Sequence, residues 1–304
     1  MDKSKMEMME EADWDRLIYQ LERGLCTPFV GAGASLSVLP SGRALSRILA
    51  DRWGYTGKHS EDLPHVIQFG GMKFGDLPHV KEIVRDELDV GRVPDFTDPH
   101  EPHGLLAGFD LPIFLTTNFD DFIARSLMAV GKTPTSAICP WNSDIPADAN
   151  LVSGDAVWKP EPNNPLVYHL HGALTDPGTL VLAEDDYHEF IWTLSAEAAT
   201  GQRQMLPPAV LKALTRQPLL FMGYSLQDLS FRILFRELNK TIPGISKRKH
   251  VSIQLEPATG VDGWGVEELM KQLRWYYGDW KITVYWGGAA EFCAELRDRM
   301  AARK

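Results

Sequence analysis

Cysteine is scarce in this 304-residue sequence, which contains only three: Cys26, Cys139 and Cys293. No two of them form a CxxC pair. A zinc site built from cysteines and a CxxC redox motif are therefore both excluded, because each needs closely spaced thiols. So low a count is typical of a chain that works in a reducing compartment, and we expect a cytoplasmic protein.

Long apolar runs and a surplus of positive charge are also missing. No stretch approaches the roughly 18 consecutive apolar residues that a transmembrane helix needs. Residues 1–14 are charged and contain no apolar segment typical of a secretory signal, so we expect neither export nor membrane insertion. With 41 acidic against 31 basic residues, the formal net charge is −10. Such a chain repels a phosphate backbone, so we expect no direct binding to nucleic acid.

What the sequence does contain is an alternation of short apolar runs with helical patterns. The runs expected to be strands are 27–30, 112–117, 136–141, 166–172, 218–225, 250–256 and 281–287. The clearest helical patterns are 12–25, 120–130, 226–240 and 291–304. Buried strands that alternate with helices predict an α/β fold, with a Rossmann-type parallel sheet covered by helices on both faces.

Two stretches interrupt this alternation. Residues 54–110 combine weak helical patterns with many glycines, prolines and histidines, and we expect a small helical insertion module there. Residues 142–165 are rich in proline, asparagine and aspartate, and we expect a long surface loop. No internal repeat is present, so the prediction is a single domain over 1–304.

A candidate phosphate-binding turn lies at 31–35, with the sequence GAGAS, between the first predicted strand and a helical pattern that includes Leu45. Gly31 and Gly33 permit a tight turn and a close approach to a ligand. The helix after them would offer free N–H groups to a pyrophosphate. The segment is not a complete G-x-G-x-x-G and the chain has no P-loop motif, so a purely structural turn stays an alternative.

Polar residues also follow the strand at 112–117, in the segment TTNFDD. Open α/β folds bind ligands at the carboxyl ends of their strands. Asn118 offers a hydrogen-bond donor and an acceptor there. Asp120 either takes part in such a site or caps the following helix.

Two histidines end the strand at 166–172, in the segment VYHLHG. His169 and His171 have i, i+2 spacing, which on a strand predicts side chains on one face. No third ligand is evident, so we expect no metal. A histidine beside Gly172 at a strand end is a natural general base, and the alternative for His171 is a structural role.

The last of the four segments, FMGYSLQD, is again a strand, a turn and a helix. Gly223 permits close approach of a ligand. Ser225 either binds a phosphate or ribose or caps the helix. In the second case Asp228 occupies the N3 position, which the helix dipole favours for acids.

In this order, the four segments resemble the sirtuin family over roughly residues 26–240. GAGAS resembles the sirtuin phosphate-binding turn, and TTNFD at 116–120 resembles the T-Q-N-[IV]-D segment. LHG at 170–172 is similar to the segment with the catalytic histidine, and GYS at 223–225 to the late G-[TS]-S turn. The resemblance implies a Rossmann-type sheet with a small second module, and NAD as the bound molecule.

The resemblance also implies roles for individual residues. Asn118 and His171 correspond to the pair that activates chemistry at the nicotinamide ribose, and Asp120 would help to hold that network. The NAD contacts that it implies are Gly31, Ala32, Gly33, Ser35, Thr116, Thr117, Asp120, Gly223, Ser225 and Asp228.

The sequence departs from the protein-deacylating sirtuins in two places. Those enzymes carry a zinc ribbon of two CxxC pairs after the HG segment, whereas this chain continues with ALTDPGTLVLAEDDYHEF. Thr117 stands where they have glutamine. Both features, with LxEDDY at 182–187, resemble sirtuin-like effectors of bacterial anti-phage systems, which consume NAD. This implies a metal-free NAD⁺ hydrolase with NAD as substrate. It also implies regulation by homo-oligomerisation or by a partner such as a HerA-type ATPase.

Three alternatives stay open. A zinc-free protein deacylase or ADP-ribosyltransferase shares the NAD pocket but needs an acceptor groove. A non-catalytic sensor of NAD or ADP-ribose would not need both Asn118 and His171. A hydride-transfer dehydrogenase is disfavoured, because GAGAS lacks the third glycine and no acid lies at a strand end about 20 residues further on.

Overall fold

The computed structural model describes residues 9–148, 151, 159–201, 205–224, 249–254, 271 and 281–303. Its strands are β1 Thr27–Val30, β2 Ile113–Thr116, β3 Thr135–Ile138, β4 Leu166–His169, β5 Leu219–Met222, β6 Lys249–Gln254 and β7 Lys281–Trp286. Its longer helices are α1 Glu11–Glu22, α2 Gly42–Trp53, α3 Leu63–Phe74, α4 Leu77–Leu88, α5 Pro102–Ala107, α6 Phe122–Ala129, α8 Glu184–Thr200, α9 Pro208–Arg216 and α12 Ala289–Ala301. Two short 3-10 helices are η1 Ala32–Ala34 and η2 Pro177–Thr179. The helical pattern predicted at 226–240 lies outside the described residues.

The seven strands form one sheet in the order β3-β4-β2-β1-β5-β6-β7. Every pairing is parallel, as in the central pairs of Phe29 with Leu115 and with Phe221. Each strand falls within or next to a run predicted from the sequence, so the predicted α/β fold with a parallel sheet is confirmed.

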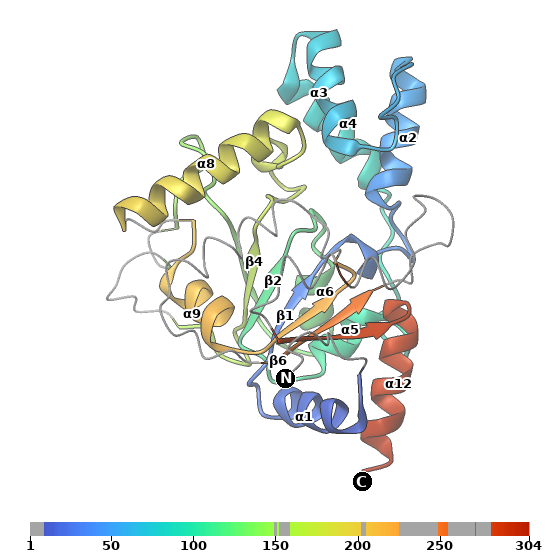
Figure 1. Ribbon diagram of the computed structural model, residues 1–304, viewed down its shortest axis with the longest axis vertical. Coiled ribbons are helices and arrows are strands. Elements are labelled where there is room, and N and C mark those ends of the chain that lie inside the picture. Colours follow the sequence, from blue (N-terminus) through green and yellow to red (C-terminus); the bar gives the residue numbers. More distant parts are fainter. Residues whose placement is uncertain are drawn as a thin grey trace.

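Helices cover both faces of this sheet, as Figure 1 shows. Successive residues of a strand point to opposite faces. Phe29 accordingly packs in one core with α8 and α9, whereas Val30 packs in a second core with α1, α5, α6 and α12. Burial on both sides explains why the strands are apolar runs rather than alternating ones.

A third core joins α2, α3 and α4 into a helical module that lies apart from the sheet layers (Figure 1). It begins before the predicted insertion of 54–110, since α2 belongs to it. Within that predicted range, α5 packs on the sheet instead, through Leu105, Leu106 and Ala107. The described residues of the predicted loop 142–165 form no strand of the sheet, although Leu151 is buried.

One buried ion pair ties the helical module to the rest of the chain. Lys81 on α4 and Asp186 in the first turn of α8 are 2.8 Å apart and almost fully buried. Lys81 also donates to the carbonyl of Leu180, and its ammonium lies 5.4 Å from the ring centre of Trp141. The other oxygen of Asp186 accepts hydrogen bonds from the backbone of Leu182 and Ala183. The LxEDDY segment thus caps α8 and anchors the module.

Three glycines let the turn after β1 pack against the turn after β5. A Cβ atom on Gly31 would lie 2.7 Å from the carbonyl oxygen of Gly223, and one on Gly33 would lie 2.8 Å from its Cα. The amide of Gly33 donates to the carbonyl of Gly223 over 2.8 Å. These glycines therefore have a packing role in the folded chain, in addition to any contact with a ligand.

Gly223→Ala is expected to lower the free energy of unfolding by about 2–5 kcal/mol, because the methyl group meets backbone and φ is left-handed. The φ angle of Gly223 is +68°, and its Cβ would lie 2.6 Å from the carbonyl carbon of Gly33. Gly75 is a matched control, since it also has φ +68° but no atom within 4 Å of a built Cβ. Gly75→Ala should cost only about 1–2 kcal/mol. Equal losses for the two variants in urea unfolding would contradict the packing argument.

The three cysteines are free and buried. Burial raises the pKa of the Cys26 and Cys293 thiols to about 12 and that of Cys139 as well. Such thiols stay protonated at neutral pH and are poor nucleophiles. In the part of the chain that the structure describes, no helix is both long enough and apolar enough to cross a bilayer.

Candidate functional site

A cavity of about 320 Å³ lies between the sheet and the helical module. Its sheet side consists of residues that follow β1, β2, β4 and β5, where the carboxyl ends of parallel strands meet. The α2 and α3 helices contribute apolar residues such as Leu45 and Leu63. The volume lies within the roughly 300–1,000 Å³ of small-molecule sites, and the position is the one where open α/β sheets bind ligands.

Asn118 is held at the cavity wall by its own side chain. Its Nδ2 group donates to the carbonyl of Gly31 over 3.2 Å and to the hydroxyl of Ser35 over 3.1 Å. Since the Gly31 carbonyl can only accept, the amide nitrogen must face it, and Oδ1 faces the other way. Within the described residues, no donor reaches this buried Oδ1 atom. A buried acceptor without a donor costs free energy, so a hydroxyl or water that reached it would bind favourably.

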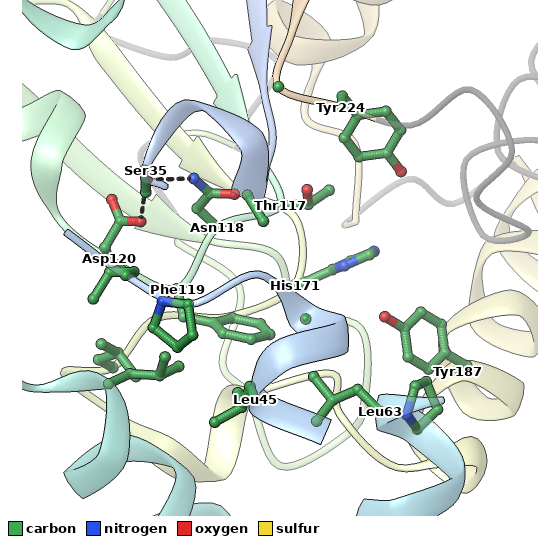
Figure 2. Close-up of a pocket in the computed structure, with 18 residues that line it drawn as sticks. Ser35, Leu45, Leu63, Thr117, Asn118, Phe119, Asp120, His171, Tyr187 and Tyr224 are labelled. Carbon is green, nitrogen blue, oxygen red and sulfur yellow. Dashed lines mark hydrogen bonds between the residues drawn. The ribbon is translucent and has the colours of Figure 1, made fainter. Parts of the chain in front are cut away.

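Ser35 connects Asn118 with Asp120, as the dashed lines in Figure 2 show. It accepts from Asn118 and donates to Oδ2 of Asp120 over 2.9 Å. Oδ1 of Asp120 accepts from the backbone of Phe122, at the start of α6, over 3.1 Å. Asp120 therefore closes the turn that leads into α6, whose N-cap residue is Asp121, and it hydrogen-bonds the serine that contacts Asn118. Its part in catalysis stays a prediction.

His171 lies beyond the end of β4 and lines the same cavity. It is 5% exposed, and its ring makes edge contacts with Tyr187 at 5.6 Å and Phe190 at 5.3 Å between centroids. Its carbonyl accepts from the backbone of Val181 over 3.0 Å. In Figure 2 the side chains of His171, Tyr187 and Tyr224 lie around one opening. The apolar neighbours fix the ring while leaving it at the cavity surface.

The structure brings together many of the residues expected from the sequence. Those that line the cavity are Ala32, Ser35, Thr117, Asn118, Asp120, His171 and Gly223. Gly31, Gly33 and Thr116 lie directly behind the wall, where they contact Asn118 or the turn after β5. Their contact with NAD stays a prediction. Ser225 and Asp228 lie outside the described residues.

The expectation that His169 and His171 share one face is wrong. β4 ends at His169, so the alternation of a strand does not extend to His171. His171 lines the first cavity, whereas His169 lines a second one of about 370 Å³. Phe119 and Asp120 contribute to the walls of both.

The helical pattern predicted around Leu45 is confirmed as α2, but this helix does not follow GAGAS directly, so its first free N–H groups lie further along the chain. A single 3-10 turn, η1, occupies 32–34, and α2 starts only at Gly42. The hydroxyl of Ser41 caps α2 by accepting from the amide of Ala44. The η1 turn thus packs against Gly223, and the chain enters the helical module only with α2.

Sequence reasoning missed the apolar and aromatic part of the cavity. Tyr187 ends the LxEDDY segment and Tyr224 lies inside the GYS segment, so both belong to motifs that the sequence already singles out. No sequence pattern places the leucines of the cavity there, because only the packing of the tertiary structure brings them together. They are Leu39, Leu45, Leu63 and Leu88. Among the described residues, no group of three or more histidine, cysteine or acidic side chains could hold a metal ion.

The fold is that of a doubly wound α/β protein, and the cavity is a candidate small-molecule site at the carboxyl edge of its parallel sheet. A family model described as a SIR2-like domain matches residues 112–284. The chain therefore belongs to the SIR2-like family. The matched range includes Asn118, Asp120, His171 and Gly223.

The chain is also similar to two curated proteins and to one solved structure. The chain is 25% identical over 224 residues to the NAD(+) hydrolase ThsA of Cytobacillus dafuensis, covering 73% of this chain and 39% of that protein. It is 23% identical over 232 residues to the NAD(+) hydrolase ThsA of Bacillus cereus (strain MSX-D12), covering 75% and 43%. The chain thus spans about two fifths of the length of these curated relatives. A structure solved in work on the mechanism and regulation of Sir2 enzymes aligns over 96% of this chain and all of that one, with 13% identity and a TM-score of 0.42.

Proposed function

We propose that this chain hydrolyses NAD⁺ to nicotinamide and ADP-ribose. The proposal rests on one observation. Asn118 and His171 line the same cavity, and the side-chain oxygen of Asn118 has no hydrogen-bond donor among the described residues. The two relatives named as NAD(+) hydrolases support it, since the similarity covers about three quarters of this chain. A binder alone would not need a histidine base beside the asparagine.

The proposed reaction breaks the bond between ribose C1′ and the nicotinamide nitrogen. The bonding electrons leave with neutral nicotinamide, and the ribose becomes oxocarbenium-like. A water molecule then adds at C1′ and releases one proton, which completes ADP-ribose. Asn118 would orient the water or a ribose hydroxyl through Oδ1, and His171 would accept the proton as general base. Asp120 and Ser35 would hold Asn118 in place through their hydrogen bonds.

The shape of the cavity fits this assignment. The cavity presents hydroxyl, amide and imidazole groups, and its leucines, Phe119 and Tyr187 add apolar and aromatic surface. A flat aromatic amide next to a sugar needs such a mixed surface, because its ring seeks apolar contact and its polar atoms seek hydrogen bonds. We place the nicotinamide ribose at this cavity for these reasons.

Incubation of the purified chain with NAD⁺ tests the proposal, with nicotinamide and ADP-ribose followed by chromatography. Both products should appear in equal amounts without any protein acceptor. Nicotinamide release only when an acylated peptide or another acceptor is added would instead favour the deacylase or transferase alternative. NAD⁺ binding without turnover would favour the sensor alternative.

The biological setting forms part of the same proposal. We infer that the chain acts as an effector of an anti-phage system and is controlled by homo-oligomerisation or by a partner such as a HerA-type ATPase. An uncontrolled NAD⁺ hydrolase would harm its host, which gives the physiological reason for such control. The NAD⁺ assay is therefore repeated in the presence of a protein encoded by an adjacent gene. The oligomeric state of both samples is measured by size-exclusion chromatography. A rate that is the same with and without that protein, at every oligomeric state, would contradict this part.

A further inference from the structure

His169 is a buried histidine that lies just behind the candidate site without lining its cavity. It is the last residue of β4 and pairs in register with Thr116 of β2 and Ile138 of β3. Its side chain is on the side of the second cavity. Its Nδ1 atom lies 3.2 Å from the backbone carbonyl oxygen of Asn118.

The protonation of the His169 ring follows from this contact. A carbonyl oxygen can only accept, so Nδ1 carries the hydrogen and donates it to Asn118. Burial lowers the pKa of His169, so the ring is neutral at neutral pH. Nε2 is then an acceptor. The ring therefore has one donor, and that donor is directed at Asn118.

The backbone of Asn118 depends on side chains because β2 ends at Thr116. Thr117 still donates its amide to the carbonyl of Val30, over 3.2 Å. The amide of Asn118 donates to the hydroxyl of Thr116 over 2.9 Å. That hydroxyl in turn donates to the carbonyl of Val30 over 3.1 Å. Thr116 thus holds the amide of Asn118, and His169 holds its carbonyl.

We propose that His169 is a positioning residue, which sets the orientation of Asn118 by donating a hydrogen bond from Nδ1 to its backbone carbonyl. The inference rests on the proposed function insofar as Asn118 acts on NAD⁺. A small displacement of a reacting group lowers turnover more than binding, because the bound substrate keeps its other contacts. His169 itself does not touch the substrate.

Two variants of nearly equal shape test this proposal. In His169→Asn the side-chain amide can still present a donor where Nδ1 lies, whereas His169→Leu has similar volume and no donor. Steady-state NAD⁺ hydrolysis should show kcat lowered about 10- to 100-fold in His169→Leu. KM should change by less than about threefold, and His169→Asn should regain most of the rate. The melting temperature of each variant is measured, so that loss of folded protein is not mistaken for loss of turnover.

Hydrogen exchange gives a readout that does not need turnover. Amides at 117–121 should exchange faster in His169→Leu than in the parent and in His169→Asn, while those of α9 stay unchanged. A parent protein that fails to hydrolyse NAD⁺ would count against the proposed function, and the exchange data would still decide the role of His169. Equal kcat in all three proteins, or equal exchange at 117–121, would overturn the inference. So would an Asn variant as impaired as the Leu variant.

Discussion

Replacing His171 by alanine is expected to slow nicotinamide release from NAD⁺ by about 10²- to 10⁴-fold, the usual contribution of a general base. The ring lies at the cavity surface between Tyr187 and Phe190, and its loss removes the proposed proton acceptor. Because the change affects chemistry more than binding, kcat should fall much more than the affinity for NAD⁺. The measurement is nicotinamide formed per enzyme, with NAD⁺ binding followed separately by calorimetry.

His100→Ala is the matched control for this experiment. His100 lies on the surface, where it hydrogen-bonds to Asp98, and its side chain is 59% exposed. Its loss should leave the rate unchanged. A companion variant, Asn118→Asp, keeps the shape of the side chain but loses both donors to Gly31 and Ser35. It should be as inactive as His171→Ala. Full activity in either site variant would remove the residue from the mechanism.

Replacing Lys81 by methionine is expected to lower the free energy of unfolding by about 3–5 kcal/mol, the usual cost of leaving one member of a buried ion pair alone. The pair is buried on both sides, with side-chain exposures of 7% for Lys81 and 8% for Asp186. Without Lys81, Oδ1 of the buried Asp186 carboxylate loses its donor and its compensating charge, and the carbonyl of Leu180 loses its donor as well. Urea unfolding followed by circular dichroism measures the loss.

Two further variants make the result specific. Lys81→Met combined with Asp186→Asn should recover much of the loss, because the unpaired charge is gone while an amide oxygen can still cap α8. Arg85→Met removes one member of an exposed pair on the same helix, with side-chain exposures of 39% and 69%. Exposed pairs contribute about 0–1 kcal/mol, so this control should change stability little. A loss for Lys81→Met as small as for Arg85→Met would contradict the anchoring role.

The anchor also connects stability with the site. Lys81 and Asp186 hold α4 against the start of α8, and α8 carries Tyr187, which contacts His171. The same module supplies the apolar wall of the cavity. Loss of the anchor is thus expected to affect substrate binding even where the sheet remains folded.

The sequence was most informative where a local pattern has one structural meaning. Runs such as 27–30 and 166–172 are largely apolar because both faces of a parallel sheet are covered, and all seven predicted strands are present. The strand ends indicate Asn118 and His171 as candidates, because strand ends meet at one edge of the sheet, and the resemblance to the sirtuins singles out this pair. Their positions at one cavity agree with that argument.

The remaining features depend on contacts between residues far apart in the chain. His169 and His171 belong to the same short sequence motif, but β4 ends between them. The ring of His169 therefore contacts Asn118, whereas that of His171 lines the cavity. From the sequence, the glycines of GAGAS are suited to a pyrophosphate-binding turn. Their tight packing against Gly223 could not be predicted, because it depends on β1 and β5 being neighbours in the sheet.

The sequence by itself determined the α/β class, the succession of strands, and the polar residues that reach the carboxyl edge of the sheet. These follow from hydrophobic periodicity and from the chemistry of single side chains, which act over a few residues. The tertiary structure alone decided that α2 belongs to the helical module, that Lys81 pairs with Asp186, and that leucines close the cavity. Each of these is a contact across tens of residues, set by which surfaces bury each other rather than by local pattern.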